Sequence, residues 1–130
     1  MTTERSAAVN DACARAAAVL QSGDVRAGLR HYEYAQRLAP SNSAITLAIG
    51  AARLHDLDPR SAEAFALIAF RDDVQEAWIG LASAHHTLGH HDLAAQSLRS
   101  LLSRHGHVRG TPTIHLHDLI ARQESRLLRG

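Results

Sequence analysis

Lysine is absent from this 130-residue chain, and all 14 of its basic residues are arginine. Without lysine the chain has no Schiff-base nucleophile and no phosphate-binding lysine of the P-loop type. Its single cysteine, Cys13, allows no internal disulfide. Neither a nucleophile-elbow motif nor a glycine-rich dinucleotide motif occurs in the sequence. We therefore expect a protein that is not an enzyme and has no cofactor.

An excess of charge of one sign is also missing. The 14 basic and 13 acidic residues are interspersed and give a formal net charge of +1. Such a balance offers no field that would attract nucleic acid or an anionic membrane. No segment approaches the run of about 18 apolar residues that a membrane-spanning helix requires, and the N-terminus does not resemble a signal peptide. The expected location is the cytoplasm, with no nucleic-acid or membrane partner.

Aromatic residues make up only 4% of the chain, and alanine supplies much of its 45% apolar content. Because alanine is the best helix former and lets helices approach closely, this composition favours many thin contacts between helices. Turn and cap residues such as Gly23-Asp24, Asn42, Asp58-Pro59 and Gly89 divide the sequence into helical segments. Asp73 and Glu76 have the spacing of a capping box. The expected helices span residues 4–21, 24–38, 42–56, 59–71, 74–88, 91–104 and 113–128.

A pattern of apolar and small residues repeats along these helices. Its best copy starts at Trp78, and two earlier copies start at Ala12 and Thr46. Ala12 and Thr46 are 34 positions apart, and Thr46 and Trp78 are 32 positions apart. The third copy reads Trp78, Leu81, Ala82 and His85 in one helix, followed by Ala94, Leu98 and Leu101 in the next. This pattern resembles the tetratricopeptide repeat, whose period is about 34 residues. The chain departs from the family pattern at Arg15, Arg53, His85 and Gly106.

The resemblance implies an all-α fold, a right-handed superhelical stack of three antiparallel helix pairs with a C-terminal capping helix. A single domain would cover residues 1–130. Its repeats would span about 9–42, 43–74 and 75–106, and the capping helix about 113–128.

In tetratricopeptide proteins, the first helix of each pair lines a concave groove. By this resemblance, the groove of the present chain would be lined mostly by apolar residues, with His55 among the polar residues at its edge. An apolar floor with a polar edge is typical of protein-binding surfaces. The alternative is that these side chains are ordinary core residues, because a short array can curl on itself. The groove positions are Cys13, Ala17, Leu20, Leu47, Ala48, Ala51, Leu54, Ile79, Ser83 and His86.

The function that follows is a protein–protein interaction scaffold that binds a peptide or an amphipathic helix in its apolar groove. A second copy of the chain, dimerising through the concave face, is a further candidate partner. One alternative is an accessory module of a bacterial glycosyltransferase or polysaccharide-assembly system, as the resemblance allows. Another is a histidine-based metal binder, since the chain has ten histidines. No spacing typical of a metal site accompanies them, and no residue is assigned as a metal ligand.

Overall fold

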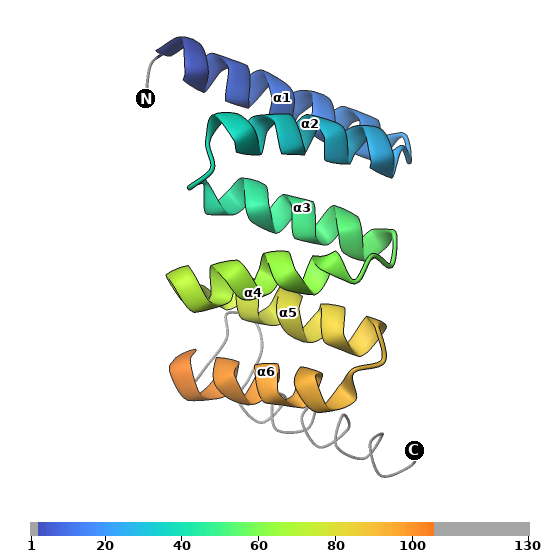
Figure 1. The fold of residues 1–130 in the computed structure, drawn as a ribbon, viewed down its shortest axis with the longest axis vertical. Helices are drawn as coiled ribbons and strands as arrows, with labels where there is room; N and C mark the ends of the chain where they lie inside the picture. The colour runs from blue at the N-terminus through green and yellow to red at the C-terminus, as the bar shows by residue number, and fades with distance from the viewer. Residues whose placement is uncertain (1–2, 106–130) are drawn as a thin grey trace. The chain divides into compact units, whose positions relative to one another are not determined.

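The computed structural model describes residues 3–105, and this part of the chain is all-helical, with six helices and no strand. It confirms the expected all-α class. Figure 1 labels the helices in chain order. The chain divides into two compact units, Met1–Ala64 and Phe65–Gly130, and each is described by itself. The helices are α1 (Thr3–Gln21), α2 (Val25–Leu38), α3 (Ser43–His55), α4 (Arg60–Asp72), α5 (Gln75–Thr87) and α6 (His91–His105).

The six helices begin and end within one residue of the bounds expected from the sequence. Two of the cap residues act locally, since Asp24 accepts a hydrogen bond from the Ala27 backbone N–H at 3.0 Å and Asn42 accepts one from Ile45 at 3.3 Å. Gly23 and Gly89 have φ angles of 92° and 84°, which favour glycine and reverse the chain between helices. The seventh helix expected at 113–128 lies outside the described residues.

The expected capping box of Asp73 and Glu76 is wrong. Val74 is the N-cap of α5, and it makes no side-chain hydrogen bond to the helix. Asp73 precedes this cap with a left-handed φ of 51°, and its carboxylate accepts a hydrogen bond from the Trp78 indole N–H at 2.8 Å. The Asp73 carboxylate therefore accepts its hydrogen bond from the indole, and not from the helix backbone as the sequence pattern predicted.

The core of the first unit joins three helices. Helix α2 packs against both α1 and α3. The Gln36 side chain adds a hydrogen bond from α2 to the Thr46 hydroxyl of α3 at 3.2 Å. Half of the residues in its core cluster are alanine, so the helices can approach closely. The cluster consists of Val9, Ala12, Ala35, Ala39, Ile45 and Ile49.

The core of the second unit contains Trp78, which is only 2% exposed. The Phe70 ring of α4 meets the indole edge-on, with centroids 5.3 Å apart, and the Arg104 guanidinium of α6 lies 5.3 Å from the indole centroid. Trp78 is thus packed against both the helix before α5 and the helix that follows it. Nearby, Gly80 of α5 faces the Phe65 ring of α4 so closely that a Cβ atom would overlap it.

We predict that Trp78→Ala lowers the free energy of unfolding by about 3–5 kcal/mol, the usual loss when a large aromatic side chain is removed from a core. Trp78→Phe keeps an aromatic ring and loses the hydrogen bond to Asp73, so it should cost less. Equilibrium urea denaturation measures both variants. A loss below about 1 kcal/mol for Trp78→Ala would contradict the packing described here.

We also predict that Gly80→Ala destabilises the protein because its methyl group overlaps the Phe65 ring. Overpacking of this kind costs about 1–3 kcal/mol, against a gain of about 1 kcal/mol in helix propensity. In a Phe65→Ala background the overlap is gone, and the same substitution should become neutral or stabilising. A double-mutant cycle by urea denaturation tests the pair, and equal effects in both backgrounds would refute the contact.

Candidate functional site

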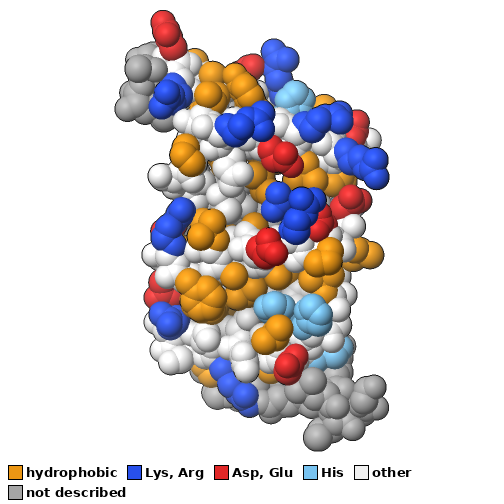
Figure 2. Space-filling view, in the orientation of Figure 1, with side chains coloured by type: hydrophobic (Ala, Val, Ile, Leu, Met, Phe, Trp, Pro, Cys, Tyr) orange, Lys and Arg blue, Asp and Glu red, His pale blue; other side chains and the backbone are white. Residues whose placement is uncertain are grey.

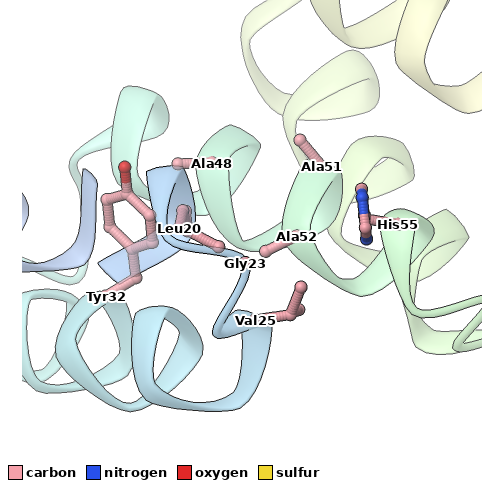
Figure 3. A pocket seen from close by; sticks show the side chains of 8 residues that line it. All are labelled: Leu20, Gly23, Val25, Tyr32, Ala48, Ala51, Ala52 and His55. Atoms are coloured by element: carbon pink, nitrogen blue, oxygen red, sulfur yellow. The ribbon is translucent and has the colours of Figure 1, made fainter. Parts of the chain in front are cut away.

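The first unit contains an open apolar pocket of about 340 Å³. Figure 3 shows the side chains around it. They come from the last turn of α1, the turn that follows it, the start and middle of α2, and α3 from its middle to its end. Since α2 packs on both α1 and α3, the pocket lies where these three helices meet. Its lining residues are Leu20, Gly23, Val25, Tyr32, Ala48, Ala51, Ala52 and His55.

The pocket exists because much of its wall is made of very small residues. The α3 side is formed by Ala48, Ala51 and Ala52, whose side chains end at Cβ. The α1 wall is held by a close helix contact, since a Cβ atom on Gly28 would lie 2.6 Å from the Leu20 Cγ atom. Leu20 therefore packs directly over α2, and the space beside it stays unfilled.

Only two of the lining side chains carry polar atoms, the Tyr32 hydroxyl and the His55 imidazole. Figure 3 draws them at opposite ends of the lining, with Leu20 and the alanines between. Burial raises the pKa of Tyr32, and the nearby Cys13 thiol raises it further, so the hydroxyl stays neutral near pH 7. None of the eight lining residues is an aspartate, a glutamate or an arginine. Such a surface suits an apolar group that needs few hydrogen bonds.

Three of the ten groove residues expected from the repeat, Leu20, Ala48 and Ala51, line this pocket. His55, expected at the groove edge, lines it too. The other groove residues of this unit do not line it. Cys13 is half-buried and packs against the core, and Ala17 is exposed. Leu47 and Leu54 are half-buried on α3.

The remaining three expected groove residues lie on α5, in the second unit. Ile79 is 41% exposed, Ser83 is exposed and His86 is half-buried. None of the ten expected groove residues is fully buried. Their side chains are therefore partly or fully accessible to solvent.

Sequence reasoning missed part of the pocket. In the second helix of the first repeat copy, which reads Gly28, Tyr32 and Ala35, Tyr32 stands where tetratricopeptide repeats usually have a phenylalanine. Here the ring is only half-buried and faces a space that larger neighbours would have filled. Val25, Ala52 and Gly23 also contribute to the lining. The sequence did contain one indication of a pocket. Gly23 and the three alanines of α3 are all too small to fill the space between the helices.

Residues 3–105 contain neither a metal cluster nor a membrane-spanning helix. Within that range, no group of three or more histidine, cysteine, aspartate or glutamate residues is placed to hold a metal ion. No helix in the same range is long and apolar enough to cross a membrane.

Comparison of the chain with protein-family models and with curated proteins finds no match. The tetratricopeptide assignment thus stays a prediction that depends on the repeat pattern. The function has to be argued from the site itself.

Burial raises the pKa of the Cys13 thiol. Because the thiolate is the reactive form, we predict that iodoacetamide alkylates Cys13 more slowly in the native protein at pH 8 than in the urea-unfolded chain. The native rate should keep rising with pH beyond about 8.5, the usual cysteine pKa. Mass spectrometry of quenched samples gives both rates. A native rate equal to or above the unfolded one would show that the thiol is not shielded.

Proposed function

We propose that this protein is a protein–protein interaction scaffold that binds a peptide or an amphipathic helix of another protein in an apolar groove. The observation that carries the proposal is the pocket of the first unit. Leu20, Ala48 and Ala51, which the repeat register assigns to the groove, all line it. An apolar pocket bordered by few polar groups is a common receptor for the anchoring side chain of a partner.

The size and chemistry of the pocket favour side chains of a helix as the occupant. A volume of about 340 Å³ accommodates more than one aliphatic or aromatic side chain. An amphipathic helix presents such side chains one turn apart on a single face. The alanines of the α3 wall let the backbone of a bound segment come close, which increases the apolar area removed from water.

In this proposal the chain has the tetratricopeptide architecture of three helix pairs with a capping helix, and it works in the cytoplasm. The equivalent positions on α5, Ile79, Ser83 and His86, would give the second unit a surface of the same kind. The partner is another protein, and a second copy of this chain is one such partner.

We predict that Ala51→Glu weakens peptide binding at least about tenfold, a loss of about 1.4 kcal/mol. The reason is that a carboxylate placed against the apolar wall loses hydration when an apolar side chain enters. Ala51 is exposed in the free protein, so the substitution should change the free energy of unfolding by less than about 1 kcal/mol. Ligands would be selected from a displayed library of amphipathic helical peptides, and their dissociation constants measured by fluorescence anisotropy.

The matched control is Ala18→Glu, which makes the same change at an exposed position of α1 that does not line the pocket. It should bind the selected peptides within about twofold of the unmodified chain. Equal losses in the two variants, unchanged binding by Ala51→Glu, or a library that yields no ligand would each overturn the proposal.

A further inference from the structure

The turn between α5 and α6 brings four histidines together in the second unit. His85 and His86 lie in the last turn of α5, while His90 and His91 lie at the start of α6. Gly89, with a φ of 84°, reverses the chain between them, and the His90 backbone N–H donates to the His85 carbonyl at 2.7 Å. Figure 2 shows histidine side chains gathered on the side where Figure 1 draws this turn.

The four imidazoles form two pairs across the turn. The ring centroids of His85 and His90 are 5.9 Å apart, and those of His86 and His91 are 5.4 Å apart. An imidazole nitrogen binds Zn²⁺ at about 2.0–2.1 Å, so two rings that share one tetrahedral ion have centroids roughly 5 Å apart. Each pair is therefore close to the separation that a shared ion requires.

The surroundings of His85 also suit a metal ligand. Its Nδ1 atom is buried and has no hydrogen-bond partner. A neutral imidazole can coordinate a metal ion through a ring nitrogen of this kind. The Asp92 carboxylate lies near enough to His85 to interact with it electrostatically, and it would attract a bound cation.

We propose that each histidine pair binds one divalent transition-metal ion of the Zn²⁺ class through two imidazole nitrogens, and that the bound ion fastens the end of α5 to the start of α6. Water would complete the coordination, because no group of three protein ligands converges anywhere in residues 3–105. Imidazole ligands select zinc, copper or nickel over Mg²⁺ and Ca²⁺, which prefer oxygen.

The test uses the full-length chain purified without a histidine tag. Isothermal titration calorimetry with ZnCl₂ should show saturable binding, and MgCl₂ should show none. The urea midpoint should be higher with Zn²⁺ than with EDTA, because an ion that binds the folded chain stabilises it. The loss of even an outer-shell partner weakens metal affinity about 10–100-fold, so losing a ligand should weaken it at least about tenfold. Accordingly, His90→Ala/His91→Ala should lose the zinc-dependent rise in midpoint.

The control is His31→Ala, which removes an imidazole from α2 in the first unit and should leave the titration unchanged. Equal midpoints in EDTA would show that the variants fold alike. The inference is overturned if the double variant binds Zn²⁺ as the unmodified chain does, or if His31→Ala loses as much affinity. Peptide binding to the pocket of the first unit is measured separately, so neither result decides the other.

Discussion

Close approach between helices through alanine and glycine is the constraint on which both units depend. Ala16 and Ala35 in the first unit, and Ala77 and Ala84 in the second, are completely buried. Where a helix carries only a methyl group or a hydrogen at the contact, its neighbour can come close enough for backbone and Cβ atoms to pack. Each such contact buries little area, so the stability of a unit is spread over many of them.

The second unit adds one large side chain to this frame. Trp78 fills space that alanines would leave, and its neighbours are arranged around it. Asp73 takes a left-handed backbone conformation next to it and accepts the indole N–H, while Arg104 covers the ring from α6. Such a conformation costs a non-glycine residue free energy, and the carboxylate–indole hydrogen bond offsets part of that cost. The first unit has no residue of this size in its core cluster, and an open pocket lies beside it.

Local signals account for what the sequence predicted well. Helix bounds follow from turn glycines and from caps such as Asp24 and Asn42, whose hydrogen bonds reach only three residues along the chain. Asp73 was misassigned because two partners compete for one carboxylate. The left-handed φ of Asp73 and the first turn of α5 bring the Trp78 indole within reach, and a capping pattern in the sequence shows neither. The histidine pairs were missed for a related reason. His85 and His90 are five residues apart, a spacing that faces no common side within one helix, and only the reversal at Gly89 brings the rings together.

The pocket could be predicted only in part. The repeat register determines which residues face the groove, but a pocket forms only where neighbouring side chains are too small to fill the space. Register pointed to Leu20, Ala48 and Ala51, but it could not tell that the Tyr32 ring would stand beside unfilled space. That space exists because the side chains of Ala48 and Ala51 are small. Leucine in place of Ala48 or Ala51 would keep the helix and its register and would occupy the volume. None of the eight lining residues carries a carboxylate or a guanidinium. For the binding proposed above, selectivity would therefore come from the shape of the pocket, which the three alanines of α3 help to set.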